Sequence, residues 1–105
     1  MSFRMLQADV LRWAKDKDLL HAENAEKQFM KFIEEVFEFK TEFDSSMGFI
    51  NRDLKLEMGD IFVTLIILCE QIGIDPEECL EMAYEKISKR KGRTINGQFF
   101  KEEDL

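Results

Sequence analysis

Acidic residues at helical spacing are the part of this sequence whose types could do chemistry. Glu34, Glu35 and Glu38 fall in one stretch, and after eighteen further residues Glu57 and Asp60 repeat the spacing. Residues three or four apart lie on one side of a helix, so each group should present its carboxylates together. Unpaired carboxylates held together repel one another. An all-oxygen cluster of this kind suits a hard divalent cation, with Mg²⁺ first and Mn²⁺ or Ca²⁺ as alternatives.

An acidic helix face is also ordinary solvated surface. On a helical projection, Phe29, Phe37 and Phe43 share one broad apolar arc and the three glutamates lie opposite. Taken alone, this pattern favours a non-catalytic helical interaction module with a solvated acidic face. The second group changes the interpretation, because Asp60 leads into the run 61–69, which is apolar on all sides. Carboxylates entering such a buried helix are rarely left without a partner, so we predict a functional acidic cluster.

Composition indicates one small, intracellular domain. The chain has 105 residues, 45% of them hydrophobic, with no Pro/Gly/Ser-rich linker, and we expect a single domain over 1–105. Cys69 and Cys79 have no metal-ligand spacing, so we expect them to pack as small hydrophobes in a reducing, cytoplasmic setting. No apolar run approaches the ~20 residues of a membrane span. A net charge of −7 argues against binding to a nucleic-acid polymer.

Positive charge is concentrated near the C-terminus. Five cations fall within eight residues, namely Lys86, Lys89, Arg90, Lys91 and Arg93. Such cations complement the negative end of a helix dipole. They are equally suited to phosphate groups, and together with an acidic cluster they fit a metal-bound, phosphate-bearing ligand.

Periodicity predicts four helices, over 3–20, 25–43, 52–72 and 76–91, followed by a hairpin within 94–100. Asn24 and Asn51 are expected N-caps, Gly73 a C-terminal residue, and Asn96-Gly97 the hairpin turn. The fold class is therefore all-α and bundle-like, with a short C-terminal β-hairpin.

Of three side chains near these elements, two have two interpretations each and one has a single interpretation. Trp13 is a core or interface residue, or an aromatic wall for a nucleobase. Lys31, three residues before Glu34, pairs with the acids or reaches a phosphate. His21 is expected to be structural, because no second His or Cys lies at ligand spacing.

The acidic pattern resembles that of the MazG-like, all-α nucleoside triphosphate pyrophosphohydrolases. The resemblance covers roughly residues 25–101. It rests on Glu34-Glu35-x-x-Glu38 and Glu57-x-x-Asp60, and on the segments Gln28–Ile33, Leu56–Asp60 and Arg90–Phe99, the last being similar to small MazG-like proteins, many from phages. In one departure, the family often carries an Asn near the basic end of the last helix, where this chain has Ala83, Tyr84 and Glu85.

The resemblance implies a four-helix MazG fold that forms a homodimer or a dimer of dimers. It implies hydrolysis of a (deoxy)nucleoside triphosphate to the monophosphate and pyrophosphate with Mg²⁺. Cleavage of a phosphoanhydride requires charge neutralisation and an oriented water. Glu35, Glu38, Glu57 and Asp60 would hold the metal, and Glu34 would orient or deprotonate the water or serve as a further ligand. The candidate substrate-binding residues are Lys31, Lys86, Lys89, Arg90 and Trp13, and the identity of the nucleotide stays open.

Assembly follows from the apolar run as well. A small helical domain offers few neighbours to enclose Phe62, Ile66 and Ile67 on every side of one helix. We expect a homodimer with residues 61–69 at its centre, since a two-fold axis lets one patch serve both subunits. In that arrangement the Phe-rich face of the second helix packs inward while its acids face Glu57 and Asp60.

Overall fold

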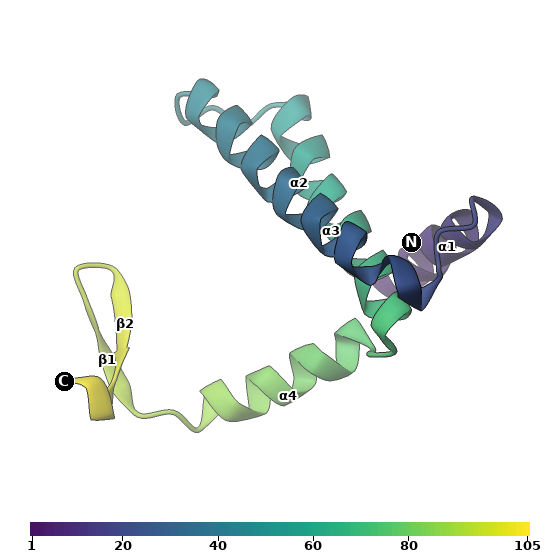
Figure 1. The fold of residues 1–105 in the computed structure, drawn as a ribbon. Coiled ribbons are helices and arrows are strands. Elements are labelled where there is room, and N and C mark those ends of the chain that lie inside the picture. The colour runs from purple at the N-terminus through teal and green to yellow at the C-terminus, as the bar shows by residue number, and fades with distance from the viewer. The chain divides into compact units, whose positions relative to one another are not determined.

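The computed structural model describes residues 1–105, and these form four α-helices and one antiparallel pair of strands (Figure 1). The expected all-α class with a C-terminal hairpin is confirmed. The elements are α1 (Phe3–Asp16), α2 (Ala25–Ser45), α3 (Arg52–Ile72), α4 (Pro76–Ser88), β1 (Gly92–Ile95) and β2 (Gln98–Lys101), with single 3₁₀ turns η1 (Ala22–Asn24) and η2 (Glu102–Asp104). Two compact units, Met1–Asp75 and Pro76–Leu105, are described in turn.

In the first unit, α2 and α3 lie side by side as an antiparallel pair, and α1 packs on α3 (Figure 1). The buried apolar core consists of Ala14, Ile66, Ile67 and Cys69. Two side-chain amides connect the elements: Gln28 Nε2 donates to the carbonyl of Thr64 at 3.2 Å, and Gln71 Nε2 donates to the carbonyl of Leu19 at 2.7 Å. The core therefore lies along the C-terminal half of α3.

Helix α1 ends at Asp16, so the expected extent to residue 20 is wrong. Asp18 adopts a left-handed backbone conformation with φ 60°. The amides of Asp18 and Leu19 then donate back to the carbonyls of Lys15 and Ala14, at 3.0 and 2.9 Å. This is the Schellman arrangement, which satisfies the last carbonyls of a helix and stops it. Aspartate tolerates the left-handed region better than most residues, and periodicity does not register such an ending.

The ends of α2 and α4 also differ from expectation. Helix α2 continues two residues further, to Ser45, whose hydroxyl donates to the carbonyl of Thr41 at 2.8 Å. Helix α4 ends at Ser88, three residues earlier than expected, and Gly92 begins β1 instead of stopping the helix. Glycine is required there because an added Cβ would collide with the carbonyl oxygen of Phe100 on β2.

Helix α3 has the expected bounds because both of its ends carry the expected signals. The Asn51 side chain accepts a hydrogen bond from the amide of Leu54 at 2.8 Å, and Gly73 lies in the left-handed region at φ 83°. Asn24 occupies the N-cap position of α2, but its side chain makes no capping hydrogen bond. Its backbone already belongs to the η1 turn, so its φ and ψ are not extended as an N-cap requires.

The second unit contains α4 and the hairpin. Strands β1 and β2 pair with Ile95 opposite Gln98, leaving Asn96-Gly97 as a two-residue turn. Both turn residues have positive φ, 53° and 80°, as a type I′ turn requires. The predicted Asn-Gly hairpin is confirmed.

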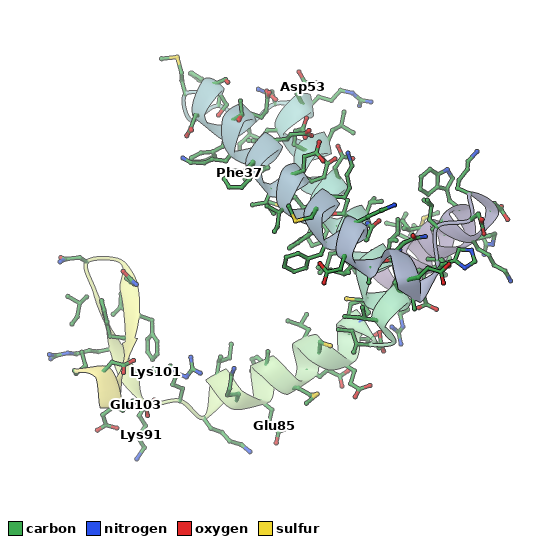
Figure 2. All side chains as sticks on the ribbon, in the orientation of Figure 1. Phe37, Asp53, Glu85, Lys91, Lys101 and Glu103 are labelled. Atoms are coloured by element: carbon green, nitrogen blue, oxygen red, sulfur yellow. The ribbon has the colours of Figure 1, made fainter.

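Burial corrects three expectations about apolar residues. Ile66 and Ile67 are buried within one chain, so of the three side chains thought to need a partner only Phe62 stays exposed. Cys69 is buried as expected, but Cys79 is exposed. The Phe-rich face of α2 packs inward only in part: Phe32 and Phe39 are half-buried, whereas Phe37 is 67% exposed and projects from α2 (Figure 2). Finally, no helix is both long enough and apolar enough to cross a membrane.

The two asparagines provide a matched pair of variants. Asn51→Ala removes a capping hydrogen bond and should cost about 1 kcal/mol of unfolding free energy, which lowers Tm by about 4–8 °C for a chain of this size. Asn24→Ala removes no capping bond and should leave Tm nearly unchanged. Thermal melts followed by circular dichroism compare the two, and equal losses would contradict the assignment of the α3 cap.

Candidate metal centre

Three carboxylates from α2 and α3 meet between the helices. One oxygen from each of Glu35, Glu57 and Asp60 lies within 4.8 Å of the other two. Their positions follow from the helix pair: Glu57 and Asp60 are one turn apart on α3, and Glu35 faces them from α2. The structure therefore brings together three of the four residues expected to bind metal.

Glu35 is the most unusual of the three, because it is the one buried residue of α2. Its side chain is 9% exposed, and its only cationic contact is Lys31 Nζ, 3.4 Å from Oε1. Its second oxygen, Oε2, is buried and has no hydrogen-bond partner, and the same is true of Glu57 Oε2. Buried polar atoms are almost always satisfied. Two unsatisfied carboxylate oxygens in one acidic cluster fit a cation as the missing partner, and oxygen ligands fit Mg²⁺ or Mn²⁺.

Burial, hydrogen bonding and mutual repulsion all act on the protonation of the cluster. Burial, followed by the charges of Asp60 and Glu35, raises the pKa of Glu57 above its usual value. A side-chain hydrogen bond to Glu35 and the charge of Glu35 raise the pKa of Glu38. Glu38 therefore adjoins the cluster through Glu35 on the same helix. A bound divalent ion would reverse these effects, because it favours the charged carboxylates.

Lys31 and Glu34 lie at the edge of the same site. Lys31 Nζ is 3.8 Å from Glu34 Oε2 as well as 3.4 Å from Glu35, and these acids raise its pKa. Of its two interpretations, pairing with the acids is the one present in the structure. The Glu34 side chain is 59% exposed, so it borders the cluster from the solvent side.

Two further acids were missed by the sequence reasoning. The charges of Glu42 and Asp53 also raise the pKa of Glu57. Glu42 continues the α2 spacing one turn beyond Glu38, and Asp53 precedes Glu57 by one turn on α3. Helical spacing extended by one turn in each direction would have found both.

Trp13 is half exposed beside a pocket of about 340 Å³ between α1 and α3. The other lining residues are Leu6, Asp9, Val10 and Val63. Val63 follows Asp60 by three residues on α3, so the pocket begins about one helical turn from the carboxylates. Trp13 is therefore a surface residue of this pocket and does not belong to the closed core.

The remaining expected residues lie elsewhere. Lys86, Lys89 and Arg90 belong to the second unit, where they line one pocket. His21 pairs with Asp18, with Nε2 and Oδ1 2.5 Å apart, and this hydrogen bond and charge raise its pKa. This partner agrees with a structural His21.

Comparison with known proteins finds similarity to a phage protein. No protein-family model matches it, and no solved structure matches it. It is 31% identical over 72 residues to an uncharacterized 18.2 kDa protein in the rep-hol intergenic region of Haemophilus phage HP1 (strain HP1c1). The match covers 69% of this chain and 42% of that protein, so the chain spans about two fifths of its relative's length.

Removing one charge from the cluster should stabilise the metal-free protein. In EDTA at pH 7, Glu57→Gln should raise Tm because it relieves repulsion with Asp60 and Glu35. Because the pKa of Glu57 is raised in the folded state, folding favours protonation of this side chain. The free energy of unfolding therefore falls as pH rises from about 4.5 through the folded-state pKa. The gain should accordingly shrink as pH is lowered below about 4.5, because the wild-type carboxyl is then protonated in both the folded and the unfolded state.

Glu34→Gln is the matched control for these melts, because its exposed charge is well solvated and its loss should change Tm little. Added Mg²⁺ should raise the Tm of the wild type, by about 2.7 kcal/mol of stabilisation at 100 times its Kd, and should do so less for Glu57→Gln. A Glu57→Gln variant less stable than wild type in EDTA would contradict the repulsive cluster.

Proposed function

We propose that this chain is a metal-dependent nucleoside triphosphate pyrophosphohydrolase that cleaves (d)NTP to (d)NMP and pyrophosphate. The observation that supports it is the meeting of Glu35, Glu57 and Asp60 between two helices, with two buried carboxylate oxygens lacking a partner. A solvated acidic face would not bury Glu35. The resemblance of these acids and their flanking residues to the MazG-like family supplies the reaction.

In this proposal the four carboxylates Glu35, Glu38, Glu57 and Asp60 hold Mg²⁺, with Mn²⁺ as an alternative. The ion, when bound, supplies charge neutralisation for the phosphate oxygens and lowers the pKa of a coordinated water. Burial of Glu35 keeps bulk water from its oxygens. The raised pKa values of Glu38 and Glu57 reflect in part the charges of neighbouring carboxylates, and a bound cation would offset these charges.

Glu34 is the proposed base. It lies next to Glu35 in the sequence, is exposed, and is only loosely held by Lys31 at 3.8 Å. It would accept a proton from the water whose oxygen attacks the α-phosphorus. The bond from that phosphorus to the bridging oxygen breaks, and the electron pair leaves with pyrophosphate. Lys31, Lys86, Lys89 and Arg90 are the proposed cations for the phosphate oxygens.

The pocket beside Trp13 is the proposed place for the nucleobase. It is lined by an indole ring, three aliphatic side chains and one carboxylate, which offer a stacking surface with a single polar acceptor. Asp9 Oδ1 already accepts from Arg12 at 2.9 Å, and its other oxygen can accept from a base N–H.

A second candidate, a non-catalytic interaction module, is favoured by the apolar surface of α2. Phe29, Phe37 and Phe43 are all exposed on this helix, although Phe39 stacks on Phe43. An aromatic surface of this extent is typical of a protein–protein contact. The protein–protein contact alone, without the non-catalytic role, is compatible with the hydrolase if the partner is a second copy of the chain.

The hydrolase is tested by product analysis. Purified protein is incubated with Mg²⁺ and a panel of canonical and damaged nucleoside triphosphates, and monophosphate and pyrophosphate are expected in equal amounts. Glu34→Gln should lower kcat by about 10²–10⁴-fold, as loss of a general base does. Glu26→Gln, an exposed acid on the first turn of α2, is the control and should keep full activity. Orthophosphate as the only phosphate product, or no product across the panel, would refute the proposal.

We also propose that the chain forms a homodimer or a dimer of dimers, and here burial gives the reason. Phe37, Phe62 and Leu80 are each exposed, and leaving such side chains in water forgoes about 1.5–3 kcal/mol apiece. Light scattering coupled to gel filtration should give at least twice the 12.5 kDa chain mass. Phe37→Glu should shift the protein toward monomer, whereas a wild-type monomer at micromolar concentration would contradict the assembly.

A further inference from the structure

The second unit contains a pocket of about 490 Å³ whose lining is strongly basic. Five cations and two carboxylates line it: Lys86, Lys89, Arg90, Lys91, Lys101, Glu102 and Glu103. The three cations nearest α4 were expected from the sequence to bind phosphate. Lys91 was counted in the basic segment but not among the substrate-binding candidates, and Lys101 was in neither group. These two lysines extend the pocket from α4 to the hairpin.

The hairpin brings these two lysines together. Gly92 pairs with Lys101 at the open end of the strands, and the amide of Glu102 donates to the carbonyl of Lys91 at 2.8 Å. The ten residues 92–101 therefore form a closed loop. Figure 2 shows Lys91, Lys101 and Glu103 together at the base of the hairpin. Gly92 permits this closure, because no side chain would fit against the Phe100 carbonyl.

Most of this positive charge has no partner within the chain. Lys89 pairs with Glu85 at 3.2 Å and Lys101 lies 4.0 Å from Glu103. The side chains of Lys86, Arg90 and Lys91 make no ion pair. The dipole of α4 explains cations at the end of that helix. It does not explain Lys101, which comes from the far strand of the hairpin, so the clustering indicates a ligand.

We propose that this hairpin-closed pocket binds an oligophosphate, meaning two or more linked phosphate groups, and that Lys91 and Lys101 are binding residues in it. Four ammonium groups provide donors that can rotate to suit several oxygens, and the Arg90 guanidinium provides a planar fork for two. The volume exceeds what one phosphate needs. The two carboxylates in the lining, Glu102 and Glu103, disfavour a long polyanion.

This inference deepens the proposed function and rests on it for the source of the ligand, since pyrophosphate is both part of the substrate and a product. The binding chemistry itself does not depend on hydrolysis. It also gives the hairpin a role: two strands alone are marginally stable, and an anion bound at their base would stabilise the closed form.

The test is calorimetric titration of the full chain with inorganic pyrophosphate in EDTA, so that the acidic cluster takes no part. Binding is expected, and the double variant Lys91→Ala/Lys101→Ala should weaken it at least tenfold. Lys27→Ala/Lys55→Ala removes the same charge from α2 and α3 and should change affinity less than twofold. A cross-strand NOE between Thr94 and Phe99, which pair in the hairpin, checks that the double variant stays folded.

Two further ligands decide the chemical class. Orthophosphate should bind at least tenfold more weakly than pyrophosphate, and a single-stranded DNA oligonucleotide should not compete. An α,β-methylene nucleoside triphosphate that binds more tightly than pyrophosphate would identify a nucleotide as the source of the phosphates, and one that binds equally would identify free pyrophosphate. No pyrophosphate binding at millimolar concentration, unchanged affinity in the double variant, or tighter binding of DNA would each overturn the proposal.

Failure of this proposal and failure of the proposed hydrolase look different. If pyrophosphate binds through Lys91 and Lys101 but no triphosphate is cleaved, the pocket stands and the hydrolase falls. If triphosphates are cleaved while the double variant binds pyrophosphate like wild type, the hydrolase stands and the pocket falls. Glu57→Gln should retain metal-free pyrophosphate binding in either case.

Discussion

The burial of Glu35 between α2 and α3 is the constraint on which the first unit depends. A carboxylate removed from water is costly unless it is paired. Lys31 supplies one contact, but Oε2 of Glu35 and Oε2 of Glu57 remain unsatisfied. The helix pair accepts this cost because apolar side chains further along α3, including Ile66 and Ile67, hold the helices in place. Apolar packing at one end of the helix pair thus offsets the free-energy cost of holding like charges together at the other end.

The same choice of helix face determines the surface of the chain. Because α2 turns Glu35 toward α3, aromatic residues on other sides of the helix stay in water. Phe37 is two thirds exposed, whereas Phe32 and Phe39 are half-buried. A helix normally buries its apolar stripe and exposes its acids. The burial of Glu35 and the exposure of Phe37 depart from this rule, and both follow from one orientation of the helix. This orientation also explains why a single chain leaves large aromatic side chains of α2 exposed to water.

Local signals predicted the elements well, and the rest required tertiary information. Asn51, Gly73 and Asn96-Gly97 act through their own backbone or nearest neighbours, so the start and end of α3 and the hairpin turn were readable. The end of α1 was not, because a left-handed Asp18 has no periodic signature. The grouping of Glu35 with Glu57 was predicted because Glu57 and Asp60 lead into the apolar run 61–69. The exposure of Phe37 was not predicted, since a helical projection shows which residues share a side but not which side is covered. Lys101 joins Lys91 only through strand pairing, which spacing along one helix cannot reveal.

Each of the two units contains a cluster of like charges that its own residues do not neutralise: acids in the first unit and cations in the second. The carboxylates of α2 and α3 raise one another's pKa values, which marks a deficit of positive charge. The cations around Lys91 and Lys101 outnumber their carboxylate neighbours, which marks a deficit of negative charge. A simple cation would satisfy the first cluster and a simple anion the second. A metal–oligophosphate complex carries both charges in one ligand, with the metal already bound to phosphate oxygens. Each unit therefore carries, by itself, the electrostatic complement of one part of such a complex, whichever nucleoside is attached to it.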